Sequence, residues 1–323
     1  MSSLSHPRKV VLITGASDGL GVDVAKKYSA TGLTVVMAGR NKAKLETARK
    51  AVQSYAKLSD KDVSERLYMV IFDLSSLNSV RQGAQDFLDL NLPLNILINN
   101  AGLLCTEREF TEDSKVFEKT IMVNMVGPML FTQLLLPRMS QTGGRILNLT
   151  SSLHDPASPT LAQPTVTDPD RLILPLDNLD GSKSWDRLSF YRASKLADVW
   201  WTYVLAERLA NSNPKITVNT LCPGFVPTTS LARDSSLFSR LRMKYVMPWF
   251  SFAISADQSS NEYLAYGIDD KYANDNGCYY RYGKKTESSK ESHDMVKAKT
   301  VWNLACDVIG MPEEKMQVSS ALS

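Results

Sequence analysis

A tyrosine and a lysine stand four residues apart in the run Tyr191-Arg192-Ala193-Ser194-Lys195. In a helix this spacing places Tyr191 and Lys195 on the same face. A free tyrosine has a pKa of about 10 and is a poor base at neutral pH, but a nearby ammonium lowers that pKa. The pair can therefore exchange a proton with a carbonyl or hydroxyl oxygen. Upstream, Ser151 and Ser152 follow an apolar strand-like run, so a serine hydroxyl can hydrogen-bond the same oxygen.

A glycine-rich turn near the N-terminus indicates a dinucleotide site. The run Thr14-Gly15-Ala16-Ser17-Asp18-Gly19-Leu20-Gly21 follows the strand-like segment 9–14 and opens a helical pattern. Glycines allow a tight turn and a close approach of the backbone to a pyrophosphate, and the helix N-terminus supplies N–H groups and partial positive charge. A loop that merely needs glycine is the alternative. The expected cofactor contacts are Gly15, Ser17, Asp18, Gly19, Leu20 and Gly21.

The residues after the second predicted strand favour NADP(H) over NAD(H). An NAD site usually carries an acid there for the ribose 2′-hydroxyl, whereas this chain reads Ala38-Gly39-Arg40-Asn41-Lys42. The Arg40 guanidinium can hold a 2′-phosphate through two hydrogen bonds, with Lys42 and Lys44 nearby. The alternative is a solvated basic turn without a ligand.

The elements that must position these residues alternate between strands and helices. Short apolar runs predict strands at 9–14, 34–38, 67–72, 94–98, 145–149 and 216–221. Amphipathic stretches predict helices at 20–30, 41–57, 76–90, 112–140 and 188–211. This order predicts an α/β fold: a doubly wound parallel sheet with helices on both faces. All the motifs then fall at the carboxyl ends of strands, where such sheets bind ligands.

Composition bounds the class of protein. The 323 residues are 43% apolar and 22% charged with a net charge of +3, which gives no basic surface for nucleic acid. The N-terminus lacks the apolar stretch of a signal peptide, and no run of 18 apolar residues predicts a transmembrane segment. Four cysteines without Cys-x-x-Cys spacing and three dispersed histidines predict no metal site. We therefore expect a cytoplasmic protein.

Taken together in this order, the motifs resemble the short-chain dehydrogenase/reductase superfamily over about residues 8–310. The resemblance implies a Rossmann-type fold in a single domain, 1–323. It implies Tyr191 as general acid/base, Lys195 as modulator of the Tyr191 pKa and ribose ligand, and Ser152 as the serine that orients the substrate. It further implies Asn124 for a proton-relay water, Asp73 and Leu74 for the adenine, Asn100, Ala101 and Gly102 beside the adenine ribose, and Pro223, Gly224, Val226 and Thr228 in the nicotinamide loop.

Two features resemble the retinol dehydrogenase and protochlorophyllide reductase branch. One is a proline-rich insertion, about 153–189, which separates Ser152 from Tyr191 by 39 positions. The other is the loop that begins at Pro223. Phe225, Met125 and Pro128 depart from the protochlorophyllide reductase pattern, which argues against light-driven reduction. Retinol dehydrogenases usually add a membrane anchor, and none is visible in this sequence.

The expected reaction is NADP(H)-linked reduction of a bulky lipophilic carbonyl compound, or the reverse oxidation of the alcohol. A polyketide, terpenoid, steroid or aromatic ketone would fit. Two alternatives remain: a non-redox enzyme on the same fold, such as a dehydratase, isomerase or cyclase, and a dinucleotide-binding regulator without turnover. Homodimers are common in this superfamily, so a homodimer is an expected partner state.

The segment 229–254 follows the nicotinamide loop and is expected to cover the substrate. Within 237–254, apolar residues recur at spacings of three and four, including Phe238, Leu241, Tyr245, Trp249 and Phe252. This pattern predicts a helical lid that excludes water. The rival interpretations are a plain packed helix and a basic amphipathic patch that makes peripheral membrane contact.

Overall fold

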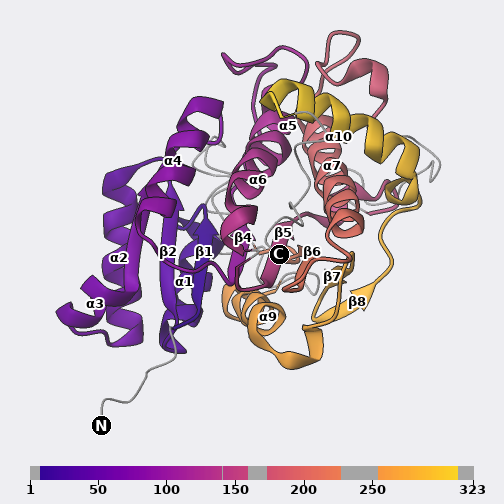
Figure 1. Cartoon of the computed structure of the whole chain (residues 1–323). Coiled ribbons are helices and arrows are strands. Elements are labelled where there is room, and N and C mark those ends of the chain that lie inside the picture. The colour runs from indigo at the N-terminus through magenta and orange to yellow at the C-terminus, as the bar shows by residue number, and fades with distance from the viewer. Residues whose placement is uncertain (1–7, 140, 159–172, 227–253, 312–323) are drawn as a thin grey trace.

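One eight-stranded sheet organises the molecule in the computed structural model, which describes residues 8–139, 141–158, 173–226 and 254–311 (Figure 1). The strand order is β3-β2-β1-β4-β5-β6-β7-β8, and neighbouring strands are parallel except β7 and β8. This confirms the predicted doubly wound α/β fold. The strands are β1 (Val10–Thr14), β2 (Thr34–Gly39), β3 (Leu67–Ile71), β4 (Ile96–Asn99), β5 (Gly144–Leu149), β6 (Ile216–Cys222), β7 (Tyr279–Arg281) and β8 (Lys284–Thr286).

Helices cover both faces of this sheet, because side chains on a buried strand alternate between two cores. Val10 and Leu12 of β1 join one core, and Val11 and Ile13 join the other. The first core contains residues of α4 (Leu77–Asp89), α6 (Gly127–Met139), α7 (Arg187–Arg208) and α10 (Met295–Ile309). The second contains residues of α1 (Gly19–Ala30), α2 (Lys42–Ala56) and α9 (Ala256–Ile268).

The helix expected at 112–140 begins later than its apolar pattern indicates. It starts as α5 (Lys119–Ile121), passes through a π-helical turn, η1 (Met122–Val126), and continues as α6. The Glu118 carboxylate caps its start by accepting the Thr120 N–H at 2.7 Å. This π-helical turn carries Asn124, and such turns frequently occur at functional sites.

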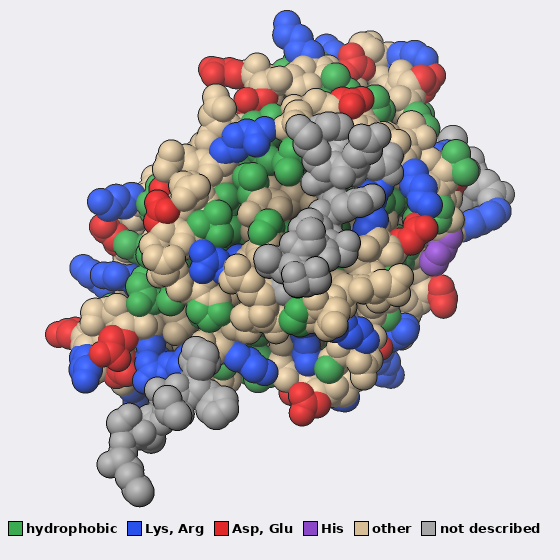
Figure 2. Space-filling view, in the orientation of Figure 1, with side chains coloured by type: hydrophobic (Ala, Val, Ile, Leu, Met, Phe, Trp, Pro, Cys, Tyr) green, Lys and Arg blue, Asp and Glu red, His purple; other side chains and the backbone are tan. Residues whose placement is uncertain are grey.

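By length and composition the segment Lys119–Met139 could cross a membrane. However, 89% of its most apolar stretch of 18 residues is buried inside the structure. It therefore has the character of a core helix. On the face seen in Figure 2, basic and acidic side chains are interspersed, as the small net charge of +3 leads one to expect.

Several elements had no predicted range: the helices α3 (Asp60–Arg66), α9 and α10, and the strands β7 and β8. The described parts of the predicted insertion form short helical turns, η2 (Ser152–His154) and η3 (Leu176–Asn178). Residues 159–172 of that insertion lie outside the described residues, as do Thr228 and the predicted lid up to residue 253.

Candidate active site

The glycine-rich turn between β1 and α1 depends on backbone geometry. Gly15 has a φ of +67°, and a Cβ there would lie 2.9 Å from the Ala101 Cα. A Cβ at Gly21 would lie 2.3 Å from the Gly15 carbonyl oxygen. Asp18 caps α1 by accepting the Gly19 N–H at 2.8 Å. The first turn of α1 after this cap contains no acidic residue, so its remaining N–H groups can donate to a phosphate group.

Two other predicted cofactor contacts in that turn, Leu20 and Ser17, differ in which of their groups can reach a ligand. The Leu20 side chain is buried in the core between the sheet and α1, α2 and α9, so only its backbone remains for a ligand. The Ser17 side chain lies beside the end of β2, where a Cβ at Gly39 would come within 3.3 Å of its Oγ. The turn and the end of β2 are therefore adjacent, as a dinucleotide site requires.

The turn after β4 is tied to the end of β1. The Thr14 hydroxyl accepts the N–H groups of Asn100, at 3.0 Å, and Ala101, at 3.1 Å. The Asn100 Nδ2 donates to the Thr14 carbonyl at 2.9 Å. From α9, the Tyr263 hydroxyl donates to the Asn100 Oδ1 at 3.4 Å. These bonds place the turn of Asn100, Ala101 and Gly102 directly beside the glycine-rich turn.

The predicted adenine end is polar and accessible. Arg40 follows β2 with a side chain that is 64% exposed, and its Nη1 lies 3.9 Å from the Asp73 carboxylate. The Asp73 carboxylate also accepts hydrogen bonds from the N–H and hydroxyl of Ser75. Leu74 is buried, and a Cβ at Gly127 would lie 2.6 Å from the Leu74 carbonyl oxygen and 3.2 Å from its Cδ2. Both the side chain and the carbonyl of Leu74 therefore pack against Gly127.

Asn124 connects the turn after β4 with α7. Its Nδ2 donates to the Leu103 carbonyl and to the Ser194 hydroxyl, each at 2.9 Å, and its Oδ1 accepts the Leu103 N–H at 2.8 Å. A Cβ at Gly102 would lie 3.4 Å from the Asn124 Oδ1 and 3.7 Å from the Lys195 Nζ. The structure thus brings the predicted Asn124, Gly102 and Lys195 together.

Helix α7 presents Tyr191 and Lys195 at the carboxyl edge of the sheet. Asp186 caps α7 by accepting the N–H groups of Leu188 and Ser189. Both Tyr191 and Lys195 are buried, and the Lys195 Nζ lies 5.8 Å from the centre of the Tyr191 ring. The Lys195 Nζ donates to the Leu149 carbonyl at the end of β5, at 3.0 Å. The predicted pair therefore exists as a buried unit anchored to the sheet.

Burial and charge set the pKa values of this unit. Burial raises the pKa of Tyr191 and outweighs the lowering by the Lys195 ammonium and by a side-chain hydrogen bond to Ser151. Burial opposes the charge on Lys195, but the Asp198 carboxylate and Tyr191 raise the Lys195 pKa overall. Lys195 therefore lowers the Tyr191 pKa, as expected from the sequence, but by less than burial raises it. At neutral pH Tyr191 is a phenol, ready to donate a proton.

Two serines follow β5 near Tyr191, and the assignment of Ser152 to the substrate stays a prediction. Ser151 is still extended, with φ −143° and ψ 152°; its hydroxyl accepts the Leu153 N–H at 3.2 Å, and its side chain contributes to lowering the pKa of Tyr191. The preceding Thr150 points to α7, where its hydroxyl donates to the Lys195 carbonyl at 2.7 Å. Ser152 already begins the turn η2, and its N–H faces the Cys222 Sγ at 3.1 Å.

The predicted nicotinamide loop leaves the sheet after β6. The Pro223 carbonyl accepts the Ser259 hydroxyl at 3.0 Å. Gly224 has a φ of +74°, and a Cβ there would lie 2.7 Å from the Ile254 Cδ1. Val226 is buried. Pro223, Gly224 and Val226 therefore hold defined places at the predicted edge.

Sequence reasoning did not find three residues of the site: Cys222, Tyr263 and Asp198. Cys222 ends β6 and interacts electrostatically with both Tyr191 and Lys195. Its place at the end of a strand was a usable signal. Tyr263 comes from α9, for which no residue range was predicted. Asp198 on α7 had no signal beyond its charge.

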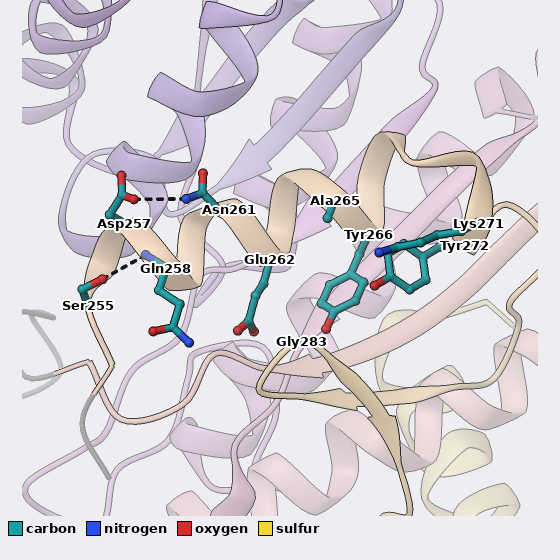
Figure 3. Close-up of a pocket in the computed structure, with 10 residues that line it drawn as sticks. All are labelled: Ser255, Asp257, Gln258, Asn261, Glu262, Ala265, Tyr266, Lys271, Tyr272 and Gly283. Carbon is teal, nitrogen blue, oxygen red and sulfur yellow. Dashed lines mark hydrogen bonds between the residues drawn. The ribbon is translucent and has the colours of Figure 1, made fainter. Parts of the chain in front are cut away.

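A separate pocket of about 450 Å³ lies along α9 (Figure 3). Glu262 and Tyr266 of α9 line it, together with Tyr272 and with Gly283 of the β7–β8 turn. None of its lining residues belongs to the predicted site. The chemistry described above therefore resides at the sheet edge and not in this pocket.

Comparisons with known proteins agree with this geometry. The family model described as short chain dehydrogenase matches residues 9–162. Human retinol dehydrogenase 12 is 31% identical over 312 residues, which cover 96% of this chain and 89% of that protein. Human polyprenol dehydrogenase is 27% identical over 311 residues, which cover 95% of this chain and 86% of that protein.

The fold is also found among solved structures. The crystal structure of an uncharacterised protein from Mycobacterium paratuberculosis matches with a TM-score of 0.68 and 24% identity, covering 95% of each chain. The chain is therefore an enzyme of the short-chain dehydrogenase/reductase superfamily and belongs to its retinol dehydrogenase-like branch.

Proposed function

We propose that this chain is an NADP(H)-dependent oxidoreductase that interconverts a lipophilic carbonyl compound and the corresponding alcohol. One observation carries the proposal: Tyr191 and Lys195 are buried together at the carboxyl edge of the sheet, with the Lys195 ammonium beside Gly102 and the turn that adjoins the glycine-rich turn. This edge is where doubly wound sheets bind dinucleotides.

The residues present fit a dinucleotide. The turn from Gly15 to Gly21 is a cradle that a Cβ would fill, because side chains there would collide with backbone atoms. The N-terminus of α1 would hold the pyrophosphate, and Lys195 the ribose of the nicotinamide half. When bound, the nicotinamide supplies a hydride to a carbonyl carbon or accepts one from an alcohol carbon.

The protein's own groups manage the proton. In reduction, the Tyr191 phenol donates its proton to the carbonyl oxygen as that oxygen gains negative charge. A serine hydroxyl after β5, that of Ser152 by the family pattern, donates a hydrogen bond to the same oxygen, and the Lys195 ammonium stabilises the phenolate that forms. In oxidation the phenolate takes the proton back. The buried setting of Tyr191 and Lys195 keeps bulk water from competing for this proton.

The preference for NADP(H) follows from the end of β2. The strand ends at Gly39 and Arg40 follows it, where an NAD site usually has an aspartate or glutamate that hydrogen-bonds the ribose 2′-hydroxyl. The exposed Arg40 guanidinium is only loosely paired with Asp73, at 3.9 Å, and is free to turn toward a 2′-phosphate. Lys42 and Lys44 are exposed nearby.

The substrate class rests on similarity. The two human relatives are named for retinol and polyprenol, both of them lipophilic alcohols. The apolar run Trp249–Phe252, expected at the substrate entrance, lies outside the described residues. We propose a terpenoid-like alcohol or carbonyl ahead of a polyketide, steroid or aromatic ketone.

The test is a panel assay. The purified protein is mixed with NADPH or NADH and with retinal, a prenyl aldehyde, a steroid ketone or an aromatic ketone, and loss of the reduced cofactor's absorbance is followed. We expect turnover with NADPH and an isoprenoid aldehyde at a higher kcat/KM than with NADH. Cofactor binding without oxidation on the whole panel, and without reduction of NADP⁺ by the matching alcohols, would contradict the proposal.

A further inference from the structure

A buried carboxylate stands one helical turn after Lys195. The Asp198 Oδ2 accepts from the Lys195 Nζ at 2.8 Å, and its Oδ1 accepts from the Trp201 Nε1 at 3.3 Å. Both side chains of this ion pair are only 3% exposed. Burying two charges carries a desolvation penalty that the attraction between them does not always repay. Stability alone therefore does not explain the pair.

A second ion pair of the same spacing, but exposed to solvent, serves as a comparison. On α1, the Lys26 Nζ and Asp23 Oδ1 are also three residues apart and 2.8 Å apart, but their side chains are 26% and 31% exposed. Water screens that pair, whereas the Lys195–Asp198 pair acts at close range on the groups around it. The two pairs differ in burial and in their distance from the proposed reaction.

Described residues of several elements act on Tyr191: Lys195 and Asp198 of α7, Cys222 of β6 and Ser151 after β5. Tyr263 of α9 also interacts with Tyr191, and burial raises the pKa of the Tyr263 phenol, so that this phenol is neutral at neutral pH. Asp198 is the carboxylate among these described residues, and it opposes the positive charge of Lys195.

We propose that Asp198 is a positioning residue: it anchors the Lys195 ammonium and offsets its positive charge beside Tyr191, which keeps Tyr191 in the proton-donating form that carbonyl reduction needs. This inference rests on the proposed function and deepens it, because it says which direction the site favours at neutral pH.

The sign of the effect follows from electrostatics. A negative charge makes both Tyr191 and Lys195 hold their protons to higher pH. Burial is the main cause of the raised Tyr191 pKa, and Asp198 adds to it; for Lys195, Asp198 is the largest of the influences that raise the pKa. Removing that charge makes both groups more acidic, so whichever loses its proton first does so at lower pH. Reduction needs both protons in place. The alkaline limb of its pH profile must therefore move to lower pH.

The experiment compares Asp198→Asn with wild type. Asparagine keeps the size of the side chain and an oxygen that can accept from Lys195, but it removes the charge. The readout is kcat/KM for carbonyl reduction against pH at saturating NADPH. We expect the alkaline limb to move down by about one pH unit, since a charge a few ångströms away shifts a pKa by roughly one to three units.

Two variants frame this result. Asp198→Glu keeps the charge and should keep the limb where wild type has it. Asp23→Asn removes the matched exposed carboxylate and should leave both the limb and the rate unchanged. Two results for Asp198→Asn would overturn the inference. One is a rate that falls equally at every pH while the alkaline limb of the pH profile stays in place, and the other is a shift of that limb to higher pH. If Asp198→Asn does not fold, Asp198→Glu decides: a limb displaced by about one unit in that variant contradicts the inference.

A second measurement separates this inference from the proposed function. If wild type reduces no carbonyl, the proposed function fails, but phenolate formation at Tyr191 can still be followed by ultraviolet absorbance. The difference between wild type and Tyr191→Phe isolates this phenol, and the same difference is taken in the Asp198→Asn background. The inference expects the phenolate to form at lower pH without the carboxylate. An unchanged titration contradicts it.

Discussion

The two sides of the site are built by different means. On the β1–α1 side, ligand contact depends on backbone: Gly15 and Gly21 leave no room for a Cβ, and the charged Arg40 lies in solvent. On the α7 side, function depends on buried side chains, with Lys195 and Asp198 each 3% exposed. On the β1–α1 side, a change of charge should lower only the affinity for the cofactor. On the α7 side, a change of charge should alter the free energy of unfolding and the pH dependence of the reaction.

The largest expected effect breaks the buried ion pair. Lys195→Met leaves Asp198 without its cation, which for a buried pair lowers the free energy of unfolding by about 3–5 kcal/mol. The matched variant Lys26→Met breaks the exposed pair on α1 and should cost less than about 1 kcal/mol. Urea unfolding of both variants at neutral pH checks the contrast. Equal losses would mean that burial does not distinguish the two pairs.

The next effect separates the two serines. Ser152→Ala removes the hydroxyl that the family pattern assigns to the substrate oxygen and should reduce kcat by about a hundredfold, the scale found when one donor to a developing oxyanion is deleted. Ser151→Ala removes a hydroxyl that accepts the Leu153 N–H and should reduce kcat less. Steady-state kinetics of the pair decide which serine serves the substrate oxygen. The reverse order of effects would assign that role to Ser151.

The cofactor side should show a smaller, more selective change. Arg40→Asp removes a charge-assisted contact worth roughly 1.5–3 kcal/mol and adds repulsion toward a 2′-phosphate. Affinity for NADPH should fall by at least about ten- to a hundredfold, while affinity for NADH falls less or improves. Titrations of both cofactors by calorimetry measure this. An equal loss for the two would show that Arg40 does not contact the phosphate.

The smallest effect concerns the support of Ser151. The Ser151 carbonyl accepts from the His154 Nδ1 at 2.7 Å, and the His154 Nε2 accepts the Ser289 N–H at 3.0 Å. Burial holds the pKa of His154 below its usual value of about 6.5. As pH falls below about 6.5, the unfolded chain gains a proton that the folded protein resists. The contribution of His154 to stability is therefore full above that pH and declines below it, by at most about 1.4 kcal/mol per pH unit.

Urea unfolding at about pH 7.5 and 5.5 tests this slope. His154→Gln should weaken the dependence of the free energy of unfolding on pH. His293→Gln is the matched control, since His293 is half exposed and is paired with Glu287 at the surface. A slope that His154→Gln leaves unchanged would assign the pH dependence to other groups.

The features that could be predicted from the sequence are those that depend on neighbouring residues. Apolar runs located the strands up to β6, and the glycines located the turn at Gly15, because these features need only neighbouring residues. The spacing of Tyr191 and Lys195 likewise predicted a shared helix face, which the structure confirms.

What sequence did not predict depends on contacts between distant segments. Asp198 resembles any charged helix residue until its burial beside Lys195 is seen. The late start at Lys119 and the three-residue strands β7 and β8 carry too little local pattern for recognition. Tertiary packing decides all of these.

The central claim is that Tyr191 transfers the proton of an NADPH-linked carbonyl reduction. The most direct measurement compares Tyr191→Phe with wild type in single-turnover NADPH oxidation, using a panel carbonyl that wild type reduces, with NADPH affinity determined separately. Tyr203→Phe, which removes a hydroxyl from the same helix where it meets Ser288, is the control. The account predicts a fall in rate of about 10²–10⁴-fold for Tyr191→Phe with NADPH affinity nearly unchanged. A rate close to wild type in that variant would contradict it.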